Sequence, residues 1–268
     1  MDSKAMTLVL ALKWLFEEGE AVVVSSDSKA TTSLGISYED KKVHATSLDN
    51  DRPVAIVSGS GDPSLVKWGF EAADEVLLKY AQNEYPVKFA SFRSAVREIE
   101  HVFMERLNHL RSFGVEPEIQ MILCGLDLSG KASIYLLDNR GLAEPRHENP
   151  GYAIIGSGFV TGGILLLRLL GYTMELDLGI LTTFILDNVS EVDIAVGPFV
   201  GESYLMRLDE KKENIVLGPM KKEAIAEYKE KSAKRKEMLR KLWRLCDSIG
   251  EEEVEEILDK IAERQVEK

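Results

Sequence analysis

Residues 20–32 read EAVVVSSDSKATT, an aliphatic run that passes into polar and charged side chains. Its branched aliphatic residues favour a β-strand over residues 20–26. An acid, Asp27, and a base, Lys29, stand at the end of that strand, and two threonines follow. This stretch sets the register against which the rest of the chain is interpreted.

The composition limits the class of protein. A chain of 268 residues can bury one substantial core, so we expect one large domain with or without an appendage. Its net charge of −12 argues against nucleic acid or an anionic membrane as the main partner. No signal peptide or membrane-spanning run is recognised, and two distant cysteines suit a reducing cytosol, so we expect a cytoplasmic protein. Four scattered histidines lack metal-ligand spacing, and no metal or other cofactor is expected.

The order of the predicted elements indicates the architecture. Strands, two long helices, strands, two helices and again strands follow one another, which is not the alternating rhythm of a doubly wound sheet. We therefore expect an α+β protein built as a four-layer α-β-β-α sandwich. Strands are expected at 7–13, 20–26, 31–38, 42–46, 53–58, 118–126, 132–137, 152–155, 198–208 and 214–217, and helices at 65–81, 89–113, 159–170 and 174–189.

The chain divides into three parts. Residues 1–6 are interpreted as a removable leader, residues 7–218 as the main domain and residues 219–268 as a charged helical extension. The extension combines a long helix that has a thin apolar stripe with a shorter amphipathic helix over 251–264. We expect it to pack on the surface or to bridge subunits.

Five motifs, taken in order, resemble those of proteasome β subunits and related N-terminal nucleophile hydrolases. Each motif is weak alone, but the resemblance extends from Thr7 to about Arg207 in the same order of elements. It implies the four-layer fold, a peptide or protein substrate and assembly into a homo-oligomeric ring, while a need for an ATPase partner stays open. The motifs are EAVVVSSDSKATT (20–32), EDKKVHA (39–45), VAIVSGSGDPSLV (54–66), IIGSGFVTGG (154–163) and VSEVDIAVGPFV (189–200).

The resemblance implies a catalytic centre around Thr7. The Thr7 hydroxyl would attack an amide carbonyl, Lys42 would ease the loss of its proton, and Asp27 would keep Lys42 charged and oriented. Ser157 and Asp193 would hold the Thr7 amine and hydroxyl in register. On spacing alone, however, Asp27 and Lys42 are an ordinary surface pair, and the GSG at 156–158 is a tight turn before a helix.

Further roles follow from the same register. Backbone N–H groups of Ser58 and Gly59, in a turn after the strand that precedes them, would stabilise the oxyanion. Thr31 would bind the extended substrate backbone. The small or apolar residues Ala30, Ile56 and Ser60 would line the first substrate pocket.

The base in this chemistry is the α-amine of Thr7, which titrates at roughly 7.7–8.0 when it is free. It is free only if Thr7 is the first residue of the mature chain. Met6 stands where this family has glycine. A methionine followed by a small residue is a substrate for methionine aminopeptidase, so a start at Met6, or trimming of residues 1–6, would expose Thr7. A Met-Thr start also resembles the connectases, which are proteasome-related transpeptidases.

Three functions therefore stay open. The favoured one is a threonine-type peptidase that forms an acyl ester on Thr7 and releases it with water. A transpeptidase would pass the same ester to an amine. A catalytically silent ring or scaffold subunit would retain residues 1–6, and Val196, in the place of a serine of the family, favours this reading slightly.

Overall fold

A computed structural model describes residues 7–31, 37–39, 41–197, 200–249, 253, 255–257 and 260. The expected leader, residues 1–6, lies outside the described residues, as does most of the expected helix at 251–264. The strands are β1 (Val9–Phe16), β2 (Gly19–Asp27), β3 (Lys29–Thr31), β4 (Ser37–Glu39), β5 (Val43–Ser47), β6 (Pro53–Gly61), β7 (Ile119–Leu126), β8 (Ala132–Leu137), β9 (Ala143–Pro145), β10 (Tyr152–Ile155), β11 (Val200–Leu208) and β12 (Ile215–Pro219). The helices are α1 (Pro63–Asn83), α2 (Phe89–Ser112), the π-helical turn η1 (Phe159–Gly163), α3 (Ile164–Leu169), α4 (Leu178–Val192) and α5 (Lys222–Ile249).

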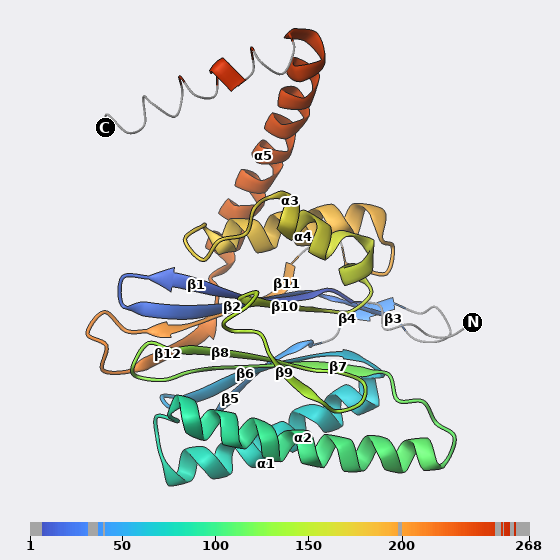
Figure 1. Cartoon of the computed structure of the whole chain (residues 1–268), viewed down its shortest axis with the longest axis vertical. Helices are drawn as coiled ribbons and strands as arrows, with labels where there is room; N and C mark the ends of the chain where they lie inside the picture. The colour runs from blue at the N-terminus through green and yellow to red at the C-terminus, as the bar shows by residue number, and fades with distance from the viewer. Residues whose placement is uncertain are drawn as a thin grey trace.

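The strands form two antiparallel five-stranded sheets in an α+β arrangement. The first sheet has the order β10-β1-β2-β11-β12 and the second has the order β5-β6-β7-β8-β9, while β3 and β4 pair separately. Figure 1 shows the two sheets stacked face to face, with α3 and α4 on the outside of the first sheet and α1 and α2 on the outside of the second. The α-β-β-α layering expected from the element order is thus seen in the structure.

Three apolar interfaces hold these layers together. The interface between the sheets contains fully buried aliphatic side chains such as Val22, Val24 and Ile56. Such side chains contribute ~1.5–3 kcal/mol each when they leave water, which makes this interface a large part of the folding free energy. Period-two alternation in β2 sends Val23 to the opposite face, where it packs under α3 and α4. A third cluster joins α1 and α2 to the second sheet.

Several boundaries differ from the sequence-based expectation for local reasons. β1 continues to Phe16, so that only Glu17 and Glu18 form the turn before β2. The helix expected from residue 174 begins at Leu178, because Asp177 caps it by accepting from the Ile180 N–H. The short edge strand β9 was not expected, since three residues carry no periodic signal.

The helix α5 leaves the sandwich beside α4 and extends away from it (Figure 1). Its first half packs on α4, where the Tyr228 ring occupies the space that a side chain at Gly179 would need. Its second half exposes apolar residues, including Trp243 at 76%. Within the part of the chain that the structure describes, no helix is both long enough and apolar enough to cross a membrane.

Candidate active site

Asp27, the last residue of β2, is the centre of a buried polar network. Its side chain is fully buried, and five donors reach its two oxygens. Oδ1 accepts from Thr7 Oγ1 at 2.8 Å, from the Leu8 N–H at 2.8 Å and from Lys42 Nζ at 2.6 Å. Oδ2 accepts from the N–H groups of Lys29 at 3.0 Å and Gly197 at 2.8 Å. A buried carboxylate is stable only when it is paired and fully hydrogen-bonded, and both conditions are met here.

Lys42 is the buried cation of this network. Only 7% of its side chain is exposed, and Nζ donates to the Lys29 carbonyl as well as to Asp27. Its own carbonyl accepts from the Gly59 N–H at 3.1 Å, so β6 fixes the main chain that carries the lysine. Asp27 and Lys42 are therefore not a surface pair. The motif register correctly predicted that these two residues meet at Thr7.

Thr7 precedes β1 and is 4% exposed. The turn at Gly156–Gly158 is closed over it, because the Gly158 N–H donates to the Thr7 carbonyl at 3.1 Å. Gly156 has φ +93°, and a Cβ there would lie 2.1 Å from the Thr7 carbonyl oxygen. Glycine is thus required at position 156 for both its backbone conformation and the close approach. The turn fixes the main chain of Thr7 while its hydroxyl faces Asp27.

Four serine hydroxyls around this end of the sandwich are buried without a hydrogen-bond partner. Ser157 lies in the turn over Thr7, and Ser26 stands beside Asp27 in β2. Ser58 and Ser60 alternate with helix-facing residues in β6, so they point toward the space between the sheets, as Ile56 does. A buried hydroxyl without a partner costs free energy, and a ligand group or an ordered water that accepts from it recovers that cost.

The expected oxyanion donors lie in a different setting from the one predicted. Ser58 and Gly59 are not in a turn, because β6 continues to Gly61. The Gly59 N–H is already used by the Lys42 carbonyl, so the prediction of Gly59 as a free donor is corrected. The Ser58 N–H as an oxyanion donor stays a prediction.

Asp193 does not contact Thr7 in the described structure. It ends α4, and its carboxylate accepts from Thr161 Oγ1 at 2.9 Å and from the Ala195 N–H at 2.9 Å. It thereby holds the segment that carries Gly197, whose N–H reaches Asp27. Its expected direct contact with the Thr7 amine is replaced here by an indirect supporting position. Thr161 and Gly197 were not singled out from the sequence, since neither residue type nor spacing marks them.

The expected substrate-binding residues are only partly accessible to description. The side chains of Ala30 and Thr31 lie outside the described part, although their backbone belongs to β3. Ile56 is fully buried in the core between the sheets, so its expected place in an open substrate pocket is wrong for this structure. Ser60 is 3% exposed and faces the same interior.

Comparison with known proteins shows the fold but no family. No protein-family model and no curated protein matches the sequence. Among solved structures, the chain resembles the Gly-1 mutant of Anbu from Hyphomicrobium sp. strain MC1, with a TM-score of 0.66, 14% identity, and coverage of 89% of this chain and 96% of that chain. It also resembles Anbu, an ancestral beta-subunit, from Yersinia bercovieri, with a TM-score of 0.65, 14% identity, and coverage of 89% and 97%.

These relatives correct the family expected from the sequence. The solved structures are of proteasome-like Anbu proteins, which are not assigned the hydrolase role of the N-terminal nucleophile family. Together with the lack of any match to a family model, this overturns the assignment of the chain to that family. An identity of 14% shows a common fold alone, so the chain has the fold of an Anbu-type ancestral β subunit.

Proposed function

We propose that the chain is a threonine-type amidohydrolase, with peptides as its substrates, that uses Thr7 as its nucleophile. One observation supports this most strongly: Thr7 Oγ1 and Lys42 Nζ converge on the same oxygen of a fully buried Asp27. Burying an unneeded ion pair is costly, at several kcal/mol per ion before pairing. A hydroxyl placed beside such a pair is typical of an activated nucleophile.

The reaction requires a base, and the α-amine of Thr7 supplies it once residues 1–6 have been removed. The amine takes the hydroxyl proton as Oγ1 bonds to the substrate carbonyl carbon. Collapse of the tetrahedral intermediate breaks the C–N bond, and the amine proton passes to the leaving nitrogen. Water then attacks the ester with the amine again as base, which releases the acid and restores the Thr7 hydroxyl. Lys42 stabilises the developing negative charge on Oγ1, and Asp27 keeps Lys42 charged.

The test is covalent labelling with a peptidyl epoxyketone, which forms a ring only with a hydroxyl and a free amine on the same residue. We expect stoichiometric labelling of the chain that begins at Thr7, detected by intact mass, and none for Thr7→Ala. Thr173→Ala is the matched control, because Thr173 is exposed and lies in the loop before α4. Labelling that persists in Thr7→Ala would overturn the proposal.

Product analysis separates hydrolysis from the two rival functions. Incubation of a cleaved peptide with a second amine-bearing peptide would yield a ligated product if the ester passes to an amine. Water as the acceptor yields the free acid alone. A chain that keeps residues 1–6 and resists labelling would be the silent scaffold, in which the Thr7 nitrogen is an amide and cannot act as a base.

We further propose that the chain assembles with copies of itself. The resemblance to an ancestral beta-subunit supports this, as do the exposed apolar residues on the outer half of α5, such as Met238 and Trp243. Light scattering on the purified chain tests it, with a monomeric mass as the contradicting result.

A further inference from the structure

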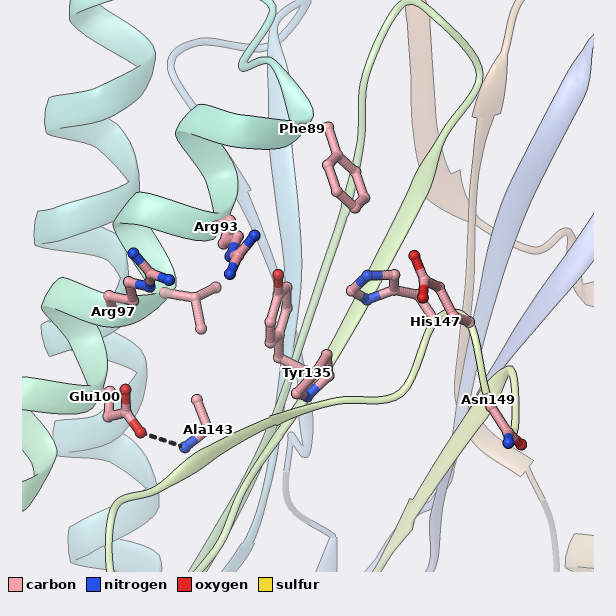
Figure 2. A pocket seen from close by; sticks show the side chains of 11 residues that line it. Phe89, Arg93, Arg97, Glu100, Tyr135, Ala143, His147 and Asn149 are labelled. Atoms are coloured by element: carbon pink, nitrogen blue, oxygen red, sulfur yellow. Dashed lines mark hydrogen bonds between the residues drawn. The ribbon is translucent and has the colours of Figure 1, made fainter.

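A second cavity lies between α2 and the segment that joins β8 to β10, apart from the Thr7 network. Its volume is about 480 Å³, which is large enough for a small organic molecule. None of the residues of the Asp27 network lines it. Figure 2 shows its lining drawn from two sides, with Arg93 and Arg97 from α2 facing Tyr135 and His147 across the opening.

The α2 wall is positively charged and unpaired. Arg93 and Arg97 are four residues apart and hence on one face of the helix. Both are exposed, and neither forms an ion pair with a carboxylate in the described part of the chain. Like charges at this spacing repel each other, and an anion between them would relieve that repulsion. Guanidinium groups hold phosphate and carboxylate oxygens in paired hydrogen bonds.

The opposite wall holds two buried polar side chains whose free atoms open to the cavity. Tyr135 is 6% exposed, and its hydroxyl makes no hydrogen bond within the described residues. His147 is 7% exposed and uses Nδ1 toward the main chain of Ile134, which leaves Nε2 without a partner among the described residues. In Figure 2 the Tyr135 hydroxyl points to the side where the Arg93 guanidinium lies. Buried polar atoms are normally satisfied, so two unsatisfied ones beside a cavity indicate a ligand.

Aromatic rings form the remainder of this wall. The His147 ring lies between those of Phe89 and Tyr135, with ring centroids 5.3 Å and 5.2 Å away. Burial raises the pKa of Tyr135, Arg93 and Arg97 oppose that rise, and Glu148 adds to it. The charges of both walls therefore act on the same hydroxyl. Stacked rings of this kind favour a flat apolar group in the ligand.

The frame of the cavity is formed before any ligand binds. Glu100 accepts from the Ala143 N–H at 2.9 Å, which ties β9 to α2 and occupies one of its oxygens. The Arg146 N–H donates to the Ile134 carbonyl at 2.8 Å, and its carbonyl accepts from the Gly151 N–H at 2.8 Å. A preformed site loses little conformational freedom on binding.

We propose that this cavity binds a small organic oxyanion, a phosphate or carboxylate attached to a flat apolar group. The oxyanion would lie between Arg93 and Arg97 and accept from the Tyr135 hydroxyl. The flat group would stack on the rings of Phe89 and His147. Glu148 lines the far side and repels a second anionic group, so the ligand carries its charge at one end only.

The test is calorimetric titration of the full chain with phenyl phosphate, benzoate, inorganic phosphate and, as the neutral control, benzyl alcohol. We expect phenyl phosphate or benzoate to bind more tightly than inorganic phosphate, and benzyl alcohol not to bind. The tighter of the two aromatic anions identifies the oxyanion. Added salt should weaken binding, because the two guanidinium groups are exposed. Absence of binding by both aromatic anions at millimolar concentration would overturn the proposal.

Variants locate the binding. The double variant Arg93→Gln with Arg97→Gln should weaken binding at least ~10-fold, since each charged hydrogen bond contributes strongly. Tyr135→Phe should weaken it roughly 3- to 10-fold while leaving folding intact, because its hydroxyl has no partner to lose. Arg106→Gln is the control, being an exposed arginine of α2 that does not line the cavity. Equal affinity in the double variant and in Arg106→Gln would refute the site.

Discussion

The network at Asp27 and the cavity beside Arg93 show opposite treatments of charge in one fold. At Asp27 five donors satisfy one carboxylate out of contact with solvent. Beside α2, two cations, a hydroxyl and an imidazole nitrogen face a cavity without partners among the described residues. The first region is complete and rigid, as a catalytic group must be, whereas the second is complete only with a ligand. Stability and binding should therefore respond oppositely to changes in the two places.

The largest expected effect is on stability. Asp27→Asn removes the charge that compensates buried Lys42, and breaking a buried pair in this way costs ~3–5 kcal/mol. The change at Arg93 and Arg97 to glutamine should alter the free energy of unfolding by no more than about 0.5 kcal/mol, because it breaks no contact. Urea denaturation measures both. If the two changes had equal effects, the two regions would not differ in the way described.

The turn over Thr7 gives the next effect. Gly156→Ala adds a Cβ at 2.1 Å from the Thr7 carbonyl oxygen, whereas Gly171, with φ +63°, has nothing within 4 Å. Both substitutions force a side chain into the left-handed region, at about 1–2 kcal/mol. Only Gly156→Ala should add an overpacking cost of about 1–3 kcal/mol and abolish epoxyketone labelling. Comparable melting temperatures for the two variants would show that the turn does not clamp Thr7.

Ser157→Ala tests an unsatisfied hydroxyl that belongs to the Thr7 region. Because Ser157 Oγ has no partner, the free energy of unfolding should change by less than about 1 kcal/mol. The labelling rate should fall roughly tenfold, corresponding to one lost hydrogen bond in the reacting complex. Ser94→Ala is the control, since Ser94 is exposed on α2. An unchanged labelling rate would remove Ser157 from the site.

The smallest effect concerns a carboxylate that is intermediate between these two cases. Burial raises the pKa of Asp187 above its usual 3.8, while Lys229, Lys236 and a hydrogen bond from Ser232 oppose the rise and Glu191 adds to it. A raised pKa means that the protonated form favours folding, so this contribution is present below pH 3.8 and is lost as the pH rises through the folded value. Asp187→Asn should therefore be more stable than the parent chain at neutral pH and equal to it in acid. Thermal melts across this range would contradict the assignment if the variant were less stable at pH 7.

The sequence predicted the Thr7 region well and the cavity not at all. Asp27, Lys42 and Thr7 belong to motifs whose order sets their register, so their meeting could be inferred. Asp193 was misplaced because a register places a residue at a helix end but does not tell which way its side chain turns. The order of paired strands and paired helices likewise indicated the layers, although the family inferred from the same motifs was wrong.

The cavity could not be predicted because it depends on packing between distant segments. Arg93 and Arg97 are an unremarkable helical pair in the sequence, and His147 stands in no recognisable motif. Only the pairing of β8 with β9 brings His147 beside Tyr135. The oxyanion donors failed for a related reason: the GSG of residues 59–61 suggests a turn, but pairing with β7 extends the strand through it.

The most direct test of the central claim is the intact mass of the chain purified from its own host, before and after epoxyketone treatment. The proposed mechanism predicts a chain that begins at Thr7 and gains one inhibitor mass, because the free amine and the hydroxyl react together. A chain that retains residues 1–6 and gains no mass would contradict it, since the nitrogen of Thr7 would then be an amide without basicity.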